Sequence, residues 1–215
     1  YVTCTSNNFF HAKTAFTTAA WVRHDNSQDG ALGSIVCHRD GGNDGFALSY
    51  NTNDNCLRLR IADGTSDDLT TANSTVSDNV WYHIIAGRDS SNNTFIYING
   101  VLSLSGSSSK TLNISQASLR IGSRSDAATS DVFGGKIRDV RMYDYALSVD
   151  QAASLYSGSY DITPTHWYKL DDNSLHVSGS TIVDDSGTGT ARDGTKTGAT
   201  DSNGTLDLDS TLTIN

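Results

Sequence analysis

The chain contains no glutamate, so all 24 of its acidic residues are aspartates. Glutamate is a good helix former, whereas aspartate is common in turns and helix caps. This bias favours a loop-rich β protein and excludes any mechanism that needs a glutamate as acid, base or nucleophile. Proline is nearly absent as well, with one residue in 215, which excludes a proline-rich linker or ligand.

Cysteine is scarce, and its three residues follow no CxxC or Cys/His spacing of the zinc type. We expect buried thiols, with a disulfide between Cys37 and Cys56 left open. No apolar run approaches the length of a membrane span. The formal charge is −9 and no lysine/arginine cluster offsets it, which argues against a nucleic-acid partner.

The most frequent pattern in the sequence is a short run of alternating apolar and polar residues. The runs at 16–23, 32–38, 45–50 and 56–62 have this character, and each predicts a strand with one buried and one exposed face. Clusters of Gly, Asn and Asp separate these runs at short intervals, as in antiparallel sandwiches.

A tight hairpin is predicted around Asn99-Gly100. Both central residues of a type I′ turn need a positive φ, which Asn and Gly tolerate. Apolar runs flank this dipeptide on both sides, so residues 94–98 and 101–105 are expected to pair.

One short helix is predicted near residue 150. Ser148 and Gln151 have the spacing of a capping box, and Gly158 can end the helix in a left-handed conformation. One such helix among ten or more strands indicates an all-β fold. We predict a two-sheet antiparallel jelly-roll sandwich with one short helix.

Four segments together resemble the laminin-G-like, concanavalin A-like jelly-roll family. The resemblance rests on their order and spacing, because each segment alone is short. They are FTTAAWVR at 16–23, VWYHIIAGRDSSNNTFIYINGVLS at 80–103, LRIGSRS at 119–125 and FGGKIRDVRMYDYALSVDQAASLY at 133–156.

The resemblance implies two antiparallel sheets of about six or seven strands each. It places Trp21 and Trp81 in the core between the sheets, as large apolar side chains. At Gly134-Gly135 a side chain would obstruct the next strand. Family members commonly bind glycans, and many bind calcium at the loops of one rim.

The opening of the family pattern stands at the far end of this chain. Members open with a strand like HWYKLDD followed by a VDDSG-like segment, and here these are residues 166–172 and 183–187. The chain therefore divides into a jelly roll without its opening strand (1–156), a linker (157–165) and the opening strands of a repeat (166–215).

Residues 166–215 have three possible arrangements. They complete this domain, they complete a neighbouring subunit in a head-to-tail assembly, or they begin the next unit of a tandem array. Without an opening strand, the edge at 136–143 is bare and prone to pairing. We expect residues 166–172 to pair beside it, within the chain or between chains.

A catalytic site is not predicted, and we expect a protein that is not an enzyme. Hydrolases on this fold use two nearby carboxylates, typically glutamates, and this chain has none. The adjacent aspartates at 67–68, 171–172 and 184–185 would point to opposite faces of a strand. No Gly-x-Ser-x-Gly elbow is present.

Oxygen-bearing side chains gather at two turns, HRDGGNDG (38–45) and GRDSSNN (87–93). Counting strands up and down puts both turns at the same end of the sandwich. Calcium takes about six to eight oxygens, so these residues are candidate ligands, with ordinary Asx turns as the alternative. The candidate metal ligands are Asp40, Asp44 and Asp89, and Asn43 and Asn92 are candidate binding residues.

A sugar site needs an exposed aromatic ring for stacking. Tyr50, Tyr82, Tyr143 and Tyr145 are candidates for that role, the sequence does not select among them, and Tyr50 is taken as the candidate binding residue. The sequence predicts a non-enzymatic structural or adhesive module of a virion, fibre or cell-surface assembly. The alternative is a calcium-dependent glycan-binding lectin. Expected partners are neighbouring subunits, through 166–215, and glycans, at an extracellular, cell-surface or virion location.

Overall fold

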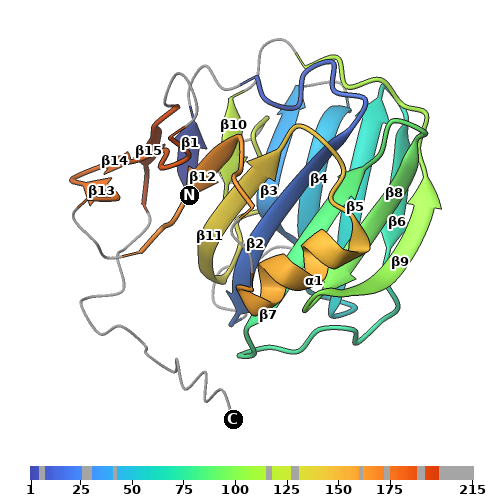
Figure 1. Ribbon diagram of the computed structural model, residues 1–215, viewed down its shortest axis with the longest axis horizontal. Helices are drawn as coiled ribbons and strands as arrows, with labels where there is room; N and C mark the ends of the chain where they lie inside the picture. The colour runs from blue at the N-terminus through green and yellow to red at the C-terminus, as the bar shows by residue number, and fades with distance from the viewer. Residues whose placement is uncertain are drawn as a thin grey trace.

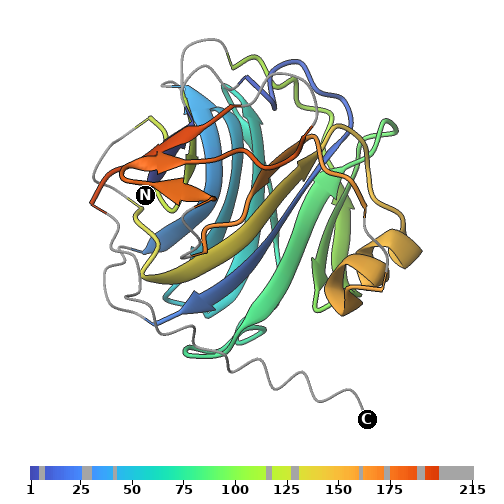
Figure 2. The ribbon, with the colours of Figure 1, turned by 60° about the vertical axis from the view of Figure 1, so that its left-hand side comes forward.

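The computed structural model describes residues 1–4, 8–25, 31–40, 43–114, 118–126, 131–159, 162–171, 175–187 and 192–198. Two antiparallel sheets face each other as a sandwich, and a helix lies on the outer side of the smaller sheet (Figures 1 and 2). The prediction of an all-β jelly roll with one short helix is confirmed.

The larger sheet has nine strands in the order β13-β14-β15-β1-β10-β3-β4-β5-β6. The prediction of six or seven strands is too low for this sheet, because the short strands β13, β14 and β15 extend it beside β1. The strands are β1 (Val2–Cys4), β3 (Leu32–Asp40), β4 (Asp44–Asn51), β5 (Cys56–Asp63), β6 (Ser66–Thr70), β10 (Leu119–Ile121), β13 (Val177–Ser178), β14 (Thr181–Ile182) and β15 (Gly194–Lys196).

The smaller sheet has six strands in the order β12-β11-β2-β7-β8-β9. The predicted hairpin is confirmed as β8 and β9, with Asn99 at φ 50° and Gly100 at φ 78°. The strands are β2 (Phe16–His24), β7 (Tyr82–Arg88), β8 (Asn93–Ile98), β9 (Val101–Ser107), β11 (Gly135–Tyr143) and β12 (His166–Tyr168).

The core lies between the inner faces of the two sheets. Alternate residues of β4 and β5 supply much of it, since every second side chain of a strand points to the same face. This packing removes large apolar side chains from water and is the main source of stability. Its largest fully buried side chains include Phe10, Phe16, Phe46, Leu48, Tyr50, Leu57, Leu59, Ile61 and Tyr168.

Helix α1 (Val149–Ser157) begins at the predicted capping box. The Ser148 hydroxyl accepts from the Gln151 amide while the Gln151 side chain accepts from the Ser148 amide. Gly158 ends the helix in a left-handed conformation, at φ 69°. Nine residues are too few to cross a membrane, and no other helix is found in the described residues. Leu155 and Ala152 pack against Ala19, Ile85, Phe95, Tyr97 and Tyr143 on the outer face of the six-stranded sheet.

The edge that was expected to be bare is paired within the same chain. Strand β12 lies antiparallel to β11, with Tyr168 opposite Val140 and Trp167 opposite Arg141. The expected pairing is confirmed for residues 166–168, and Figures 1 and 2 show these C-terminal strands on one side of the sandwich. Residues 172–174, 188–191 and 199–215 of the predicted opening segment lie outside the described part. The division into domain, linker and opening strands stays a prediction.

The expectation for Trp21 and Trp81 is wrong, whereas those of buried thiols and of a crowded Gly135 are confirmed. Trp21 and Trp81 are half-buried and do not belong to the core between the sheets. The cysteines are free, and Cys37 cannot bridge to Cys56 because β4 separates their strands. The prediction for Gly135 holds, since a Cβ there would lie 2.2 Å from the Arg23 carbonyl oxygen.

Candidate functional site

The outer face of the nine-stranded sheet carries a row of residues that runs straight across five strands. Arg120 of β10 pairs with Cys37, Cys37 with Ala47, Ala47 with Arg60, and Arg60 with Asp68. The alternation of β5 explains the row, because Leu59 and Ile61 point into the core and leave the arginines between them outside. Small residues therefore lie in the middle of the face and arginines lie at its sides.

We call this surface the arginine face. Its outward residues on β3 and β5 come from alternate positions of their strands, and Arg124 follows β10 in the chain. Cys37, Ala47 and Ser49 between them are buried, and Cys37 Sγ lies 3.5 Å from the Ser125 hydroxyl. The face comprises Arg39, Arg58, Arg60, Arg120 and Arg124.

One carboxylate organises the β5 side of the arginine face. Asp68 accepts hydrogen bonds from Arg60 Nε at 2.8 Å and Arg60 Nη2 at 2.9 Å. Arg58 Nη1 lies 3.6 Å from the same carboxylate. Burial, and then the neighbouring positive charge of Arg60, lower the pKa of Arg58. Two guanidinium groups thus compete for one carboxylate, and Arg60 holds it.

Asn43, a predicted binding residue, belongs to the arginine face. Its side-chain oxygen accepts from Arg39 Nη2 at 3.2 Å and from Arg60 Nη1 at 3.3 Å. On the opposite side of the face, Arg124 pairs with Asp126 at 2.5 Å through Nε. Asn43 and the carboxylates thus hold the guanidinium groups in place before any ligand arrives.

Several guanidinium N–H groups on this face have no partner among the described residues. The Nε atoms of Arg39, Arg58 and Arg120 are buried without a hydrogen-bond acceptor. A buried donor without a partner carries an uncompensated desolvation cost. The five arginines face three paired carboxylates, Asp68, Asp126 and Asp131, so this surface is locally positive in a chain of charge −9. It can accept an anion through charge-assisted hydrogen bonds.

The two turns predicted to bind calcium lie on the same rim, with other groups between them. Asn43 donates to the Gly64 carbonyl at 3.5 Å, and Lys110 pairs with Asp63 at 3.1 Å beyond it. Arg88, at the end of β7, donates to the Lys110 carbonyl at 2.5 Å. The β5–β6 turn and the Lys110 ammonium therefore separate the turn holding Asp40 and Asp44 from the turn after Arg88.

Asp89 closes its own turn. One carboxylate oxygen accepts from the amides of Ser91 and Asn93, both at 2.8 Å, and the other accepts from the Asn93 side chain. Burial raises the pKa of Asp89, but these hydrogen bonds outweigh it and lower the pKa overall. Asn92 stands at φ 69° in the same turn. Among the described residues no three acidic, histidine or cysteine side chains gather to hold a metal, and calcium binding stays a prediction.

Tyr50 points into the core. Its ring stacks on His24 with centroids 4.0 Å apart, and its hydroxyl lies 2.9 Å from Asn55 and 3.0 Å from Asp78. An exposed ring was the basis for choosing Tyr50 as a sugar-binding residue, and its 2% exposure removes that basis.

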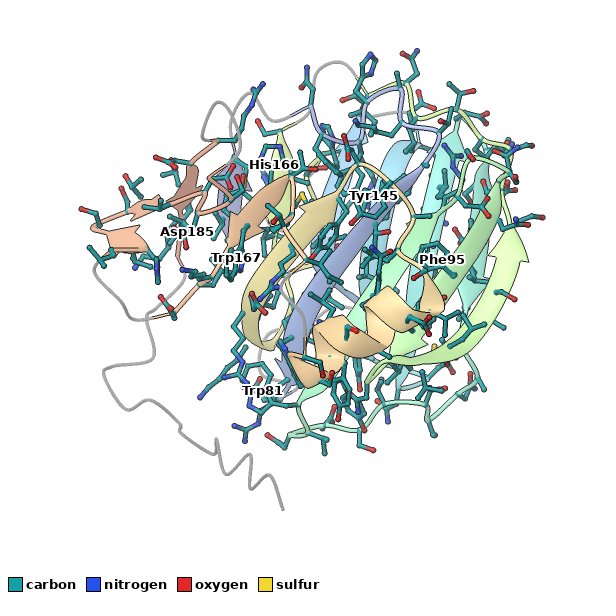
Figure 3. The ribbon with its side chains drawn as sticks, viewed as in Figure 1. Trp81, Phe95, Tyr145, His166, Trp167 and Asp185 are labelled. Atoms are coloured by element: carbon teal, nitrogen blue, oxygen red, sulfur yellow. The ribbon has the colours of Figure 1, made fainter. Side chains whose placement is uncertain are left out.

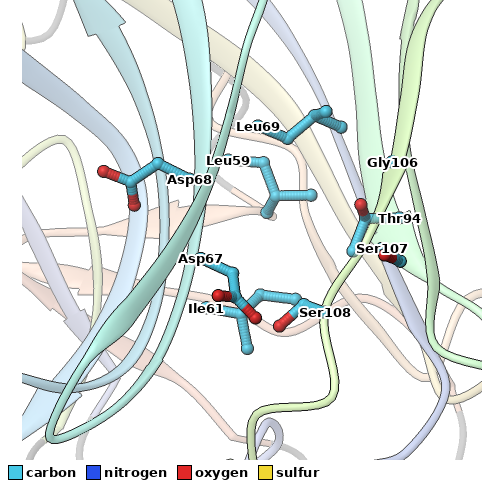
Figure 4. A pocket seen from close by; sticks show the side chains of 9 residues that line it. All are labelled: Leu59, Ile61, Asp67, Asp68, Leu69, Thr94, Gly106, Ser107 and Ser108. Atoms are coloured by element: carbon cyan, nitrogen blue, oxygen red, sulfur yellow. The ribbon is translucent and has the colours of Figure 1, made fainter.

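A cleft of about 190 Å³ opens between the edge strands β6 and β9 (Figure 4). Leu59, Ile61 and Leu69 line it together with Thr94, Asp67 and the serines 107 and 108. Asp68 also borders the cleft, but its carboxylate is held by Arg60 on the outer face. The cleft therefore lacks the two facing carboxylates that a glycosidase needs.

Sequence reasoning named Asn43 only as an oxygen donor beside a calcium site, and it missed the arginines around Asn43. Arg58 and Arg60 are visible in the sequence as one face of an alternating strand, but Arg39, Arg120 and Arg124 come from distant segments. Only the register between strands brings them together, and that register is not readable from one sequence.

The model of the concanavalin A-like lectin/glucanases superfamily matches residues 1–153. No curated protein matches the chain in sequence. A Bacteroides ovatus protein described as carbohydrate-binding is similar in structure, with a TM-score of 0.65, 22% identity and 90% of this chain covered. The match spans 54% of that protein's length.

The CBM40 module of the Ruminococcus gnavus IT-sialidase is also similar. Its TM-score is 0.57 at 17% identity, over 67% of this chain and 84% of that one. The same module bound to α2,3 sialyllactose matches equally well, with a TM-score of 0.57. At these identities the likeness establishes the fold.

Proposed function

Because the chain belongs to the concanavalin A-like lectin/glucanase superfamily, we propose that it is a non-enzymatic module that binds acidic glycans on its arginine face. It acts as an adhesive part of a surface, on the outside of a cell or on a virus particle. The single observation that carries the proposal is the cluster of five arginines on one face of an acidic chain, three of which have a buried Nε without an acceptor among the described residues.

A sugar carboxylate or sulfate suits this surface better than a neutral sugar. A guanidinium presents two parallel donors to a carboxylate, and such charge-assisted pairs are about twice as strong as neutral hydrogen bonds. Arg58 Nη1 lies 3.6 Å from the Asp68 carboxylate, beyond hydrogen-bond distance. A ligand carboxylate there would pair with a guanidinium that has no carboxylate of the described residues within hydrogen-bond distance.

Binding without catalysis is supported by the aspartates. Asp67 and Asp68 are neighbours on β6, and Asp68 turns outward to Arg60. A glycosidase needs two carboxylates across one bond, and the described residues offer no such pair in the cleft. The chain has no glutamate to supply one elsewhere.

An adhesive or assembly role is supported by the C-terminal strands. Residues 166–196 add strands to both sheets, since β12 pairs with β11 and β15 pairs with β1. A segment that completes two sheet edges can do so for its own chain or for a neighbour. Self-association through 166–215 is therefore part of the proposal.

Replacing Arg58 by glutamine tests the glycan site. Wild-type protein is expected to bind α2,3 sialyllactose and not lactose, and Arg58→Gln should weaken that binding about tenfold, the loss of one charge-assisted hydrogen bond. Asp68 stays paired with Arg60 in this variant, so the fold is retained. Isothermal titration calorimetry gives the affinities.

The matched control is Lys13→Gln, which removes a surface cation outside the arginine face, paired only at 4.0 Å with Asp144, and should leave sialyllactose binding unchanged. The arginine face is excluded as the acidic-sugar site if the wild type binds lactose as tightly as sialyllactose. It is also excluded if Arg58→Gln binds sialyllactose as tightly as the wild type does. A chelator should have no effect. Loss of binding on chelation would support the calcium-dependent alternative at Asp40, Asp44 and Asp89.

A further inference from the structure

All three tryptophans of the chain gather on the outer face of the six-stranded sheet, beside helix α1. Trp21 of β2 contacts Tyr156 of the helix, with ring centroids 5.7 Å apart. Trp81 precedes β7 and Trp167 lies on β12. Figure 3 shows Trp81 and Trp167 on the side of the sheet that carries the helix. All three are half-buried, so part of each side chain meets solvent.

Cations stack on each of these rings. The Arg138 guanidinium lies 4.5 Å from the Trp81 ring centre and 5.6 Å from that of Trp21. Arg141 and Lys169 lie 4.3 Å and 4.6 Å from the Trp167 ring centre. Such pairs hold a flexible cation in a fixed position.

A β-bulge orients the Trp167 end of this surface. Strand β11 shifts register between Arg138 and Arg141, and Asp139 between them stands at φ 53°. Its carboxylate accepts from Trp167 Nε1 at 2.5 Å and from Arg141 Nε at 2.9 Å. A left-handed aspartate is strained, and here the strained residue fixes both an indole and a guanidinium.

The charge of this surface is opposite to that of the chain. Lys136 pairs across the strands with Arg23, so two further cations lie next to Arg138. Two carboxylates pair with these cations, Asp139 with Arg141 and Asp185 with Lys169. Among the described residues, the four cations Lys136, Arg138, Arg141 and Lys169 outnumber these two carboxylates, which leaves a positive strip in a protein of net charge −9. The strip, which we call the tryptophan face, comprises Trp21, Arg23, Trp81, Lys136, Arg138, Arg141, Trp167 and Lys169.

We propose that the tryptophan face binds an extended anionic polysaccharide, with sugar carboxylates on the cations that the indoles hold in place. Indoles and cations alternate along it over strands from β12 to β2, which fits a chain that carries repeated charges. The net charge of −9 repels duplex nucleic acid, with one charge per about 1.7 Å, more strongly than a polysaccharide that carries one charge per sugar ring. This second surface goes beyond the proposed function, since it lies on the other sheet and makes the module bivalent.

Tryptophan fluorescence tests this proposal without interference from the arginine face, because every tryptophan of the chain belongs to the tryptophan face. Polygalacturonate is expected to change the emission of the wild-type protein at low salt, and uncharged dextran is not. The double variant Lys136→Gln/Arg138→Gln should bind polygalacturonate at least about fivefold more weakly, and raised salt should weaken the wild type as well. Lys13→Gln, which removes a cation outside the tryptophan face, should behave as the wild type.

No emission change with polygalacturonate, or an unchanged affinity in the double variant, would overturn the proposal and leave the cation–indole stacks a structural role. Tighter binding of a single-stranded oligonucleotide than of polygalacturonate would overturn the choice of polymer. Co-sedimentation with insoluble pectate gives a second readout that does not depend on fluorescence. Sialyllactose titrations of the same variants keep failure of this proposal distinct from failure of the proposed function.

Discussion

Replacing Tyr168 by alanine is expected to lower the free energy of unfolding by about 3 to 5 kcal/mol, the usual cost of removing a large buried aromatic ring. Tyr168 is fully buried in the core between the sheets. Its hydroxyl donates to the Arg192 carbonyl at 2.6 Å, and its backbone lies opposite Val140. One side chain thus ties β12 to the core and to the segment before β15. Urea unfolding followed by circular dichroism gives the free energy.

Tyr168→Phe is the matched control, because it keeps the ring and removes only the hydroxyl. It should cost about 1 kcal/mol. If Tyr168→Ala unfolds at the wild-type urea concentration, β12 is not part of the cooperative unit. If the wild-type midpoint rises with protein concentration, the strands of 166–196 are supplied by a neighbouring chain, as mass action requires.

Local signals in the sequence predicted single elements well. The Asn99-Gly100 turn and the Ser148–Gln151 capping box each depend on residues a few positions apart, and both are present as expected. Such contacts need no knowledge of the rest of the fold. The pairing of β12 with β11 was also predictable, because the family pattern leaves that edge without its strand.

The sequence put Trp21 on the wrong face of its strand, because the alternation of β2 does not show which of its two faces points into the core. Trp21 and Val22 are neighbours, so either alternation gives the strand an apolar face. Val22 points into the core, and Trp21 lies on the outer face beside the helix. A sheet covered by a helix on its outer side has apolar residues on both faces, and the period of two then no longer tells inside from outside.

The candidate sites depend on register, which the sequence leaves open. Both faces form from residues that are distant in the chain, such as Arg60 and Arg120, or Trp81 and Arg138. A shift of one residue in any strand would turn its arginines into the core. Counting strands correctly predicted that the turns at 38–45 and 87–93 lie on the same rim. A strand count cannot reveal that Lys110 lies between them.

Asp184 anchors the C-terminal strands through hydrogen bonds from four partners. It accepts from His166 Nδ1 at 2.6 Å and from the amides of Trp167, Arg192 and Ser186 at 3.0, 3.2 and 3.3 Å. Its side chain is fully buried. Burial alone raises the pKa of Asp184, but the hydrogen bonds outweigh it and lower the pKa to about 2. The carboxylate therefore stabilises the folded state only while it is ionised.

Lowering the pH should remove this contribution in a defined window. Because the folded pKa lies below the unfolded value of 3.8, the stabilisation is complete above about pH 4 and is lost as the pH falls towards 2, an effect of about 2 kcal/mol. Asp184→Asn should cost about 2 to 4 kcal/mol at pH 7, since an amide cannot accept all four hydrogen bonds. Urea unfolding of both proteins at pH 7 and pH 3 measures the difference. The gap between wild type and Asp184→Asn should narrow at pH 3, and a constant gap would show that Asp184 does not titrate in this window.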